Sequence, residues 1–321
     1  MPYIDHSIIA AFAQDKVNLD SDSVNDYREQ GKQLRERLDK HLEEAPEYAL
    51  VKMLNSGSVA KGTALSTIGD MDLAVYVKAA EAPTKEEDLI YWLRDRLKEA
   101  YPQLDDDQFE PQHHCVKLIF RTASYVDVDV VPVLYEGEAD NVGYLIEKDT
   151  GRRVRTSVSR HLEFIRKRKD NSPSNYAQVA RLLKWWAGQQ KARDSELRFK
   201  SFMIELICAH LCDKGVNFSD YPAAMEAFFT YIVRSGLRER IWFADYYQAG
   251  KLPAPNSAEI EIFDPVNPEN NIAASYTREN REKILAIATD ALEALTDAAY
   301  ATTKARAVED WQMVLGPSFR G

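Results

Sequence analysis

One segment restricts the fold more than any other, residues 55–77, which read NSGSVAKGTALSTIGDMDLAVYV. From Met71 to Val77 apolar side chains occupy alternate positions, which is the period of a β-strand with one covered face. A second run of strand type, Val51–Leu54, leads into Gly57, and we expect a short helix from about Val59. The segment therefore predicts a strand, a glycine turn, a short helix and a second strand that starts with acidic residues.

The polar residues of this segment suit the binding of a phosphate and a cation. Gly57 lets the backbone approach a phosphate closely, and the Ser58 hydroxyl and the N–H groups at the helix start can bind its oxygens. Asp70 and Asp72 are two positions apart on a strand, so both carboxylates project from one face. Carboxylates held side by side repel each other unless a cation lies between them. With a triphosphate at Ser58, Mg²⁺ is the expected cation.

A third acid would complete a two-metal site for phosphoryl transfer. The strand-type run Tyr125–Pro132 supplies two candidates, Asp127 and Asp129, which share one face. An acid on a strand beside Asp70 and Asp72 could also activate an attacking ribose hydroxyl. The structural alternative is a glycine turn followed by two solvated acids on an edge strand.

The rest of the chain predicts two regions of different character. Residues 27–44 and 86–100 read as helices and residues 116–121 and 126–134 as strands, so the first region is a small mixed sheet backed by helices. From about Ser157 the pattern is helical. Helices are expected at Tyr176–Gln190, Ser201–Asp213, Ala223–Val233 and, capped by Thr277, up to Ala299. The predicted fold is α+β, with domains 1–156 and 157–321.

Four elements together resemble the signature of the DNA polymerase β-type nucleotidyltransferases: Gly57-Ser58, Gly62-Thr63, Asp70-Met-Asp72 and the later strand acid. The helical half is similar to the C-terminal lobe of oligoadenylate synthases and of bacterial cGAS/DncV-like nucleotidyltransferases. That likeness is carried by RLLKWW at 181–186, KSFMIE at 200–205 and FDPVNPENN at 263–271. It covers nearly the whole chain and is greatest to the clade C, HORMA-associated enzymes of CBASS anti-phage operons. This resemblance implies an active site in a cleft between the two lobes.

Carried over position by position, the resemblance implies that Ser58 holds the donor triphosphate and that Gly57 makes room for it. Asp70, Asp72 and Asp129 are implied to bind two Mg²⁺ ions, with Mn²⁺ as a substitute, and Asp129 matches the third acid because Val-Val-Pro follows it. Asp127 matches no catalytic position and is kept as a supporting residue.

Three residues of the helical half are implied nucleotide contacts. Lys184 matches a lysine that contacts the donor phosphates and Ser201 a further phosphate contact, while Phe202 falls where relatives stack an aromatic ring on the donor base. The alternatives are a lysine whose aliphatic stem lies along apolar surface and an aromatic side chain of the core.

The implied activity is an ATP-using oligonucleotide cyclase that makes a second messenger, with cyclic tri-adenylate favoured, in anti-phage defence. The implied partners are a HORMA-domain protein and a Trip13-like AAA+ ATPase. Two alternatives stay open at this point. One is a nucleotidyltransferase that extends RNA or modifies a small molecule, and the other is a catalytically silent nucleotide-sensing module.

Charge and cysteine content narrow the partners further. The chain has 51 Asp and Glu against 41 Lys and Arg, a net charge of −10, which disfavours broad polynucleotide binding. The dense basic region Arg152–Lys169 is either a solvated helix face or a local site for DNA or an acidic partner. Cys208, His210 and Cys212, with His113-His114-Cys115, suggest zinc, but buried structural cysteines are favoured. No signal peptide or membrane span is predicted, so a cytoplasmic protein is expected.

Overall fold

The computed structural model describes residues 2–43, 48–79, 85–122, 125–171 and 175–321. The chain divides into two compact units, one formed by residues 19–163 and the other by residues 1–18 together with 164–321. This division differs from the expected one because α1 (His6–Phe12) packs against α8 (Tyr221–Ser235) of the helical unit. The end of the first unit also falls inside helix α5 (Val158–Asn171) rather than ahead of it.

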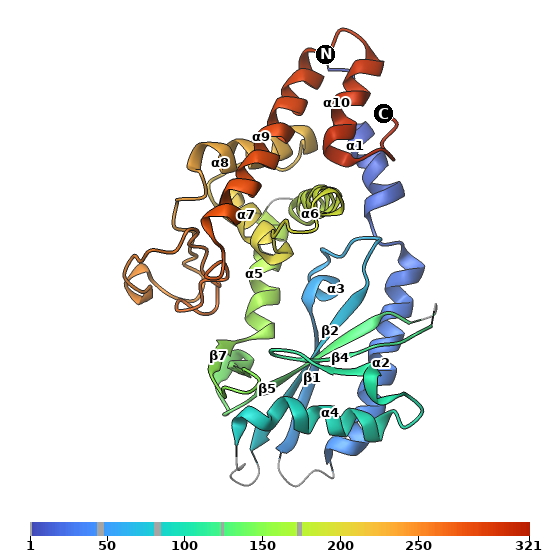
Figure 1. The fold of residues 1–321 in the computed structure, drawn as a ribbon, viewed down its shortest axis with the longest axis vertical. Coiled ribbons are helices and arrows are strands. Elements are labelled where there is room, and N and C mark those ends of the chain that lie inside the picture. Colours follow the sequence, from blue (N-terminus) through green and yellow to red (C-terminus); the bar gives the residue numbers. More distant parts are fainter. Residues whose placement is uncertain (1, 44–47, 80–84, 123–124, 172–174) are drawn as a thin grey trace. The chain divides into compact units, whose positions relative to one another are not determined.

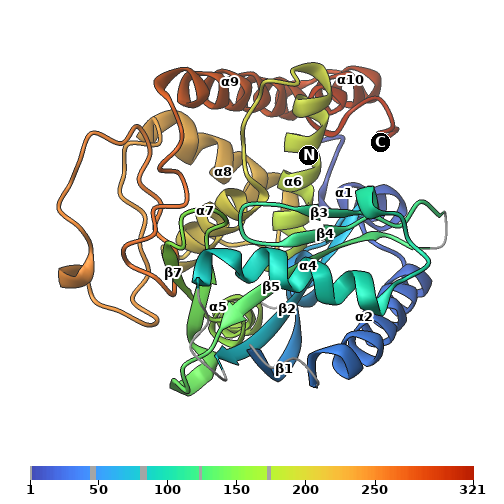
Figure 2. The ribbon, with the colours of Figure 1, turned by 60° about the horizontal axis from the view of Figure 1, so that its bottom comes forward.

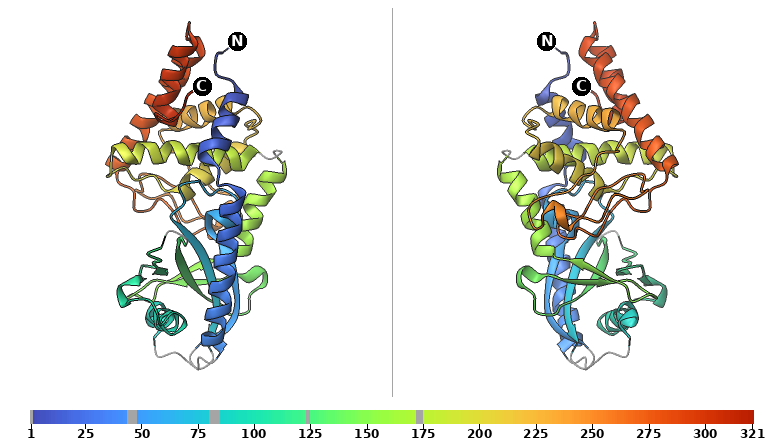
Figure 3. Two further views of the ribbon diagram at one scale, coloured as in Figure 1. Left: turned by 90° about the vertical axis from the view of Figure 1, so that its right-hand side faces the viewer. Right: turned by 90° about the vertical axis from the view of Figure 1, so that its left-hand side faces the viewer.

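The first unit, residues 19–163, is a mixed sheet with helices (Figures 1 and 3). Its described strands pair in the order β1-β2-β5-β4-β3, and β6 joins β5 to β7. The β2–β5 pair is parallel, whereas the other pairs are antiparallel. The elements are α2 (Ser21–Glu43), β1 (Tyr48–Ser56), α3 (Gly57–Lys61), β2 (Asp70–Ala79), α4 (Leu89–Ala100), β3 (Phe109–Pro111), β4 (Val116–Leu118), β5 (Asp127–Leu134), β6 (Gly143–Ile146) and β7 (Arg153–Thr156), with short 3₁₀ turns at 86–88, 106–108 and 139–141.

Alternation along β2 sorts its side chains between two cores. The predicted set, Met71 to Val77 in steps of two, is buried in the larger core, together with residues of α2 and α4. Leu34, Leu38 and Leu42 recur on one face of α2 and supply that helix's share of this core. On the opposite face of the sheet, Ala74 and Tyr76 pack with Val133 and Val158. Asp70 and Asp72 have the same parity as Ala74, so they belong to this second face.

The second unit is helical. In Figure 2, α9 and α10 follow each other along one side of this unit, and α9 also packs against α8. Buried side chains lie on several sides of helix α6 and include Tyr176, Leu183 and Trp186. Burial of this kind is typical of a helix in the centre of a core. Thr277 caps α9 as predicted, in a reciprocal pair with Asn280. The elements are α1, a π-helical turn at Ala13–Val17, α6 (Asn175–Arg193), α7 (Ser201–Asp213), α8, a 3₁₀ turn at Ala249–Lys251, α9 (Arg278–Tyr300) and α10 (Lys304–Leu315).

Among the described residues, no helix is both long enough and apolar enough to cross a lipid bilayer.

Candidate active site

The acidic residues singled out in the sequence lie on two neighbouring strands. In the parallel β2–β5 pair, Asp70 is in register with Asp127, and Asp72 with Asp129. Neighbouring strands are about 4.8 Å apart, and residues in register project from the same face of a sheet. The fold therefore gathers four carboxylates at the start of two adjacent strands, as the interpretation of the sequence required.

Asp129 carries the clearest sign of a cation site. Its Oδ1 atom is buried and has no hydrogen-bond partner among the residues that the structure describes. Burial, followed by the neighbouring charge of Asp70, raises the pKa of the Asp129 carboxyl. A buried carboxylate oxygen beside other carboxylates is costly unless a positive charge reaches it. Asp70, Asp72 and Asp129 therefore fit a divalent cation.

The three acids are spread rather than tightly clustered. The carboxylate oxygens of the three do not all lie within 4.8 Å of one another. Mutual repulsion between carboxylates favours such a spread.

Asp127 is engaged differently from Asp129. Its Oδ1 atom accepts a hydrogen bond from the Phe120 backbone N–H at 3.0 Å, and its Oδ2 atom lies 3.4 Å from the Lys117 ammonium. Lys117 is directly opposite Asp129 in the antiparallel β4–β5 pair. The Asp127 carboxylate thus ties β4 and the chain after it to β5. This placement is consistent with the supporting position that Asp127 was assigned from the sequence.

Gly57 is required by the position of Asp72. Its φ is +65°, in the left-handed region, and a Cβ added there would lie 1.6 Å from Asp72 Oδ2. The cause is local, because Ser56 pairs with Asp72 across the antiparallel β1–β2 ladder and Gly57 follows directly. The glycine therefore makes room for a carboxylate of the site, in addition to the phosphate approach inferred from the sequence.

We expect Gly57→Ala to reduce product formation at least about tenfold, because the new methyl group displaces the Asp72 carboxylate. Steady-state turnover under saturating nucleotide measures this loss. Gly69→Ala is the matched control, since nothing lies within 4 Å of a Cβ at that position. Equal turnover of Gly57→Ala and Gly69→Ala would contradict the role given to Gly57.

Ser58 lies in the first turn of α3, directly after Gly57. The helix begins two residues earlier than expected and ends at Lys61, and the left-handed backbone of Gly62 forms its C-terminal cap. The carbonyl of Ser58 accepts a hydrogen bond from the Thr63 N–H at 2.9 Å, which closes this turn. Figure 1 shows α3 at the end of the sheet where β1 stops and β2 starts. Ser58 is thereby held beside the carboxylates.

The other three predicted residues lie together in the helical unit. The Lys184 ammonium of α6 is 3.3 Å from Glu205 of α7, and both side chains are buried. Ser201 is the exposed first residue of α7 and lies one turn before Glu205, on the same face. Phe202 follows and is half-buried. The structure thus brings Lys184 to the end of α7 that carries Ser201 and Phe202.

From the sequence, no function was assigned to Lys117 or Glu205, and Cys115 was considered only as a disfavoured zinc ligand. Lys117 could not be recognised from the sequence, because only the register of the β4–β5 pair brings it beside the acids. Burial, and then the charges of Asp129 and Asp72, raise the pKa of the Cys115 thiol to about 12, which keeps it protonated. Glu205 belongs to the KSFMIE motif noted in the sequence, but the sequence does not indicate that it pairs with Lys184 of another helix.

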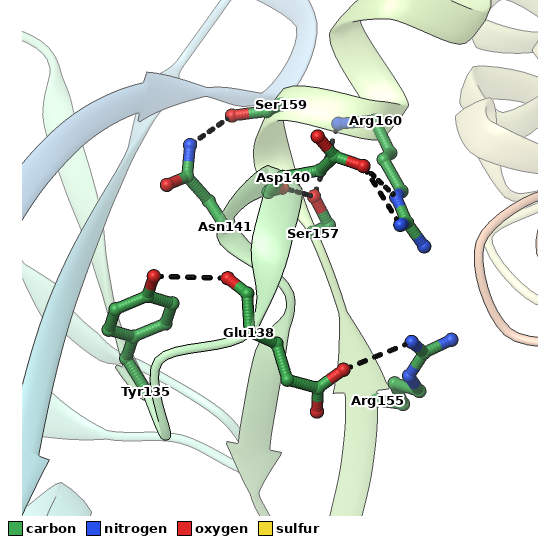
Figure 4. Close-up of polar contacts among 8 residues, drawn as sticks. All are labelled: Tyr135, Glu138, Asp140, Asn141, Arg155, Ser157, Ser159 and Arg160. Atoms are coloured by element: carbon green, nitrogen blue, oxygen red, sulfur yellow. Dashed lines mark hydrogen bonds and ion pairs between the residues drawn. The ribbon is translucent and has the colours of Figure 1, made fainter.

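The arginines of the basic region Arg152–Lys169 that lie in the first unit are paired with acids of that unit. Arg155 pairs with Glu138 at 3.3 Å, and Arg160 pairs with Asp140 at 2.9 Å (Figure 4). The same loop is fixed by the Ser157 hydroxyl, which donates to the Asp140 carbonyl at 2.6 Å. These arginines anchor the 139–141 turn to the start of α5. They are not a solvated row of charge.

Arg168 is a buried structural residue of the second unit. Its guanidinium binds Asp213 and Asp245 and lies 3.7 Å above the centre of the Phe164 ring. Lys167 lies 3.8 Å from Asp245, and both Lys167 and Arg166 are exposed. Loss of Arg168 would leave two carboxylates uncompensated, so neutralising the whole run would test stability rather than ligand binding.

Side chains of the motif FDPVNPENN at 263–271 form hydrogen bonds with the backbone of the motif and of its neighbouring residues. Asp264 accepts the Val266 N–H at 2.8 Å, and Asn267 accepts the Glu269 N–H at 3.1 Å. Asn271 accepts from the Ile262 and Ala273 N–H groups and donates to the Ile260 carbonyl. Its short polar side chains thus satisfy the backbone of an irregular loop.

Comparisons with known proteins agree with this geometry. The profile of the Second Messenger Oligonucleotide or Dinucleotide Synthetase domain matches residues 5–168. The chain is 47% identical over 319 residues, 99% of both chains, to the cyclic AMP-AMP-AMP synthase of Escherichia coli strain MS 115-1. It is 28% identical to the CBASS oligonucleotide cyclase CdnC of E. coli strain KTE188, over 95% of this chain and 94% of the relative.

Solved structures give the same picture. E. coli MS115-1 CdnC, in complex with HORMA-deltaN and in a structure with ATP, matches with a TM-score of 0.89 and 47% identity. These matches cover 99% of this chain and 99% or 100% of the other. Vibrio cholerae DncV, a cyclic AMP-GMP synthase in complex with nonhydrolyzable GTP, matches with a TM-score of 0.76 at 13% identity, over 98% of this chain and 96% of that one. The predicted α+β nucleotidyltransferase fold is confirmed.

Proposed function

Because the chain belongs to the family of Second Messenger Oligonucleotide or Dinucleotide Synthetases, and is therefore a nucleotidyltransferase, we propose that it joins ATP into cyclic AMP-AMP-AMP. The product is taken from a relative that is 47% identical over 99% of both chains. The main structural support for this reaction is that the carboxylates at the start of β2 are in register with those of β5. All three proposed metal-binding acids and Ser58 are present, which disfavours the silent-sensor alternative.

Nucleotidyltransferases of this family use divalent metal ions, and we assign Asp70, Asp72 and Asp129 as the ligands for two Mg²⁺ ions. When bound, such ions neutralise the triphosphate and the departing pyrophosphate. We propose that the Asp129 carboxylate also accepts the proton of the attacking ribose hydroxyl. That hydroxyl oxygen forms a bond to the α-phosphorus, and pyrophosphate leaves. The Ser58 hydroxyl and Gly57 hold the donor phosphates.

In the helical unit we assign Lys184 and Ser201 to the donor phosphates and Phe202 to the donor base. Lys184 lies 3.3 Å from Glu205 and is almost fully buried, so phosphate must share the ammonium with this carboxylate. The pair keeps the flexible lysine side chain in one orientation and so lowers the entropy lost on binding. The half-buried ring of Phe202 retains a stacking surface.

A HORMA-domain protein is the proposed partner, because a 47% identical CdnC forms a complex with HORMA-deltaN. A Trip13-like AAA+ ATPase follows from the same operon resemblance. DNA contact at Arg152–Lys169 is the weaker proposal, since acids already pair with Arg153, Arg155, Arg160 and Arg168.

The test is incubation of the purified full chain with Mg²⁺ and each radiolabelled nucleoside triphosphate, with and without the HORMA partner. We expect ATP alone to give a phosphatase-resistant product that co-migrates with cyclic AMP-AMP-AMP, faster with the partner present. Label that is extended onto added RNA would support the RNA-extending alternative. No product with any nucleotide, with and without partner, would contradict the proposed function.

A further inference from the structure

Two turns of the first unit bring together two imidazoles and a carboxylate that the proposed catalysis does not use. His113 and His114 are the central residues of the β3–β4 turn, which the Gln112 N–H closes on the Cys115 carbonyl at 2.8 Å. Glu147 begins the β6–β7 connection. The Lys148 N–H donates to the His113 carbonyl at 2.9 Å, so backbone bonding fixes the two turns side by side.

The three side chains match the ligand set of a transition metal. One ligand atom from each of His113, His114 and Glu147 lies within 4.8 Å of the others, and no other such group of three occurs among the described residues. His113 Nε2 lies 3.2 Å from Glu147 Oε1. Two ligands that bind zinc at about 2.0–2.1 Å in tetrahedral geometry are about 3.3 Å apart. This pair therefore already has the spacing that a metal ion requires.

The surroundings orient two of these ligands. Glu147 is 6% exposed, and its Oε2 atom accepts the Thr150 hydroxyl at 3.1 Å. His114 Nδ1 lies 3.4 Å from the Ile146 carbonyl, so donation there leaves Nε2 as the ligand atom. A second hydrogen bond of this kind is what usually fixes a metal-binding imidazole.

We propose that His113, His114 and Glu147 bind Zn²⁺ or a similar first-row transition metal ion and that Arg152 competes for the same carboxylate. Two imidazoles and one carboxylate form a three-ligand zinc site with a fourth position for water. The Arg152 guanidinium bonds Glu147 Oε1, the oxygen nearest His113, yet its side chain is 68% exposed and can move away. The ion would join the β3–β4 turn to the β6–β7 connection.

The experiment is calorimetric titration of tag-free full-length protein with ZnCl₂ in excess MgCl₂, which occupies the proposed catalytic carboxylates. We expect His114→Ala to weaken zinc binding at least about tenfold. Arg152→Gln, which removes the competing cation, is expected to strengthen it. His41→Ala is the matched control and is expected to change nothing, because His41 lies 3.9 Å from Glu99 but belongs to no group of three potential ligands among the described residues.

Wild type and His114→Ala binding zinc equally, or Arg152→Gln weakening zinc binding, would overturn the proposal. If His114→Ala does not fold, His113→Ala replaces it, since that side chain is 64% exposed. The visible absorption spectrum of Co²⁺ bound in place of Zn²⁺ gives an independent readout. Absorption bands with the intensity of tetrahedral Co²⁺ that disappear in His113→Ala would support these ligands. Bands unchanged in that variant would count against them. None of these readouts depends on nucleotide chemistry, so they are separable from the proposed cyclase activity.

Discussion

The double substitution Asp70→Asn with Asp72→Asn is expected to abolish product formation and to leave the fold intact. Both residues stand at the start of β2 on the face that they share with Asp129, and asparagine keeps their shape while removing the charge. Losing a cation site costs several kcal/mol of transition-state stabilisation, on the order of a thousandfold in rate. Turnover of labelled ATP, followed by thin-layer chromatography, measures the loss.

The matched control is Asp88→Asn, an exposed acid of the same unit at the start of α4. It is expected to keep full turnover. Circular dichroism and thermal melting establish that the double variant is folded. A folded double variant that retains more than about a tenth of wild-type turnover would remove these two acids from the catalytic site.

The second large effect is expected at β5, where Asp129→Ala is inactive and Asp127→Ala is milder. The buried oxygen of Asp129 lacks a partner among the described residues, whereas Asp127 accepts the Phe120 N–H and pairs with Lys117. Alanine at 129 should therefore cost on the order of a thousandfold in turnover, and alanine at 127 on the order of tenfold. Side-by-side kinetics of the two variants measure the order.

Thermal melting in the presence of a metal chelator tests independently whether Asp129 is the third acid of the site. The pKa of Asp129 is raised in the folded protein, so its ionised form disfavours folding at pH values above the normal carboxyl pKa. Asp129→Asn should therefore raise the melting temperature at neutral pH, and the gain should shrink as the pH falls toward that pKa. Asp127→Asn should lower it. If substitution of Asp127 reduced turnover more than substitution of Asp129, and if Asp127→Asn rather than Asp129→Asn raised the melting temperature, the third acid would be Asp127.

Short-range patterns were sufficient for much of the fold and of the site. The alternation from Met71 to Val77 and the fourfold spacing of leucines in α2 predicted elements that the structure contains. The Gly-Ser and Asp-Met-Asp pattern identified the nucleotidyltransferase superfamily, and general likeness over the chain identified the HORMA-associated cyclases within it. The comparisons confirm this family.

What the sequence left open depends on contacts between distant segments. Nothing local indicates that Lys117 stands opposite Asp129, because strand register is set by long-range pairing. The π-helical turn at Ala13–Val17, the strands β6 and β7, and helix α10 were likewise not predicted. The residues Lys184, Ser201 and Phe202 remain assignments by resemblance, and the buried Lys184–Glu205 pair makes the lysine the most informative of them to substitute.

The contact between position 57 and Asp72 has a consequence for mutational tolerance. Every amino acid except glycine carries a Cβ, so every missense change of this codon places an atom where an Asp72 oxygen now lies. Position 57 should therefore be intolerant of all substitutions, small ones included, in a saturation library scored for function. A smaller residue at position 72 would relieve the contact but would also remove a carboxylate of the site, so it is not expected to restore function. Position 57 should therefore stay glycine for as long as position 72 is aspartate.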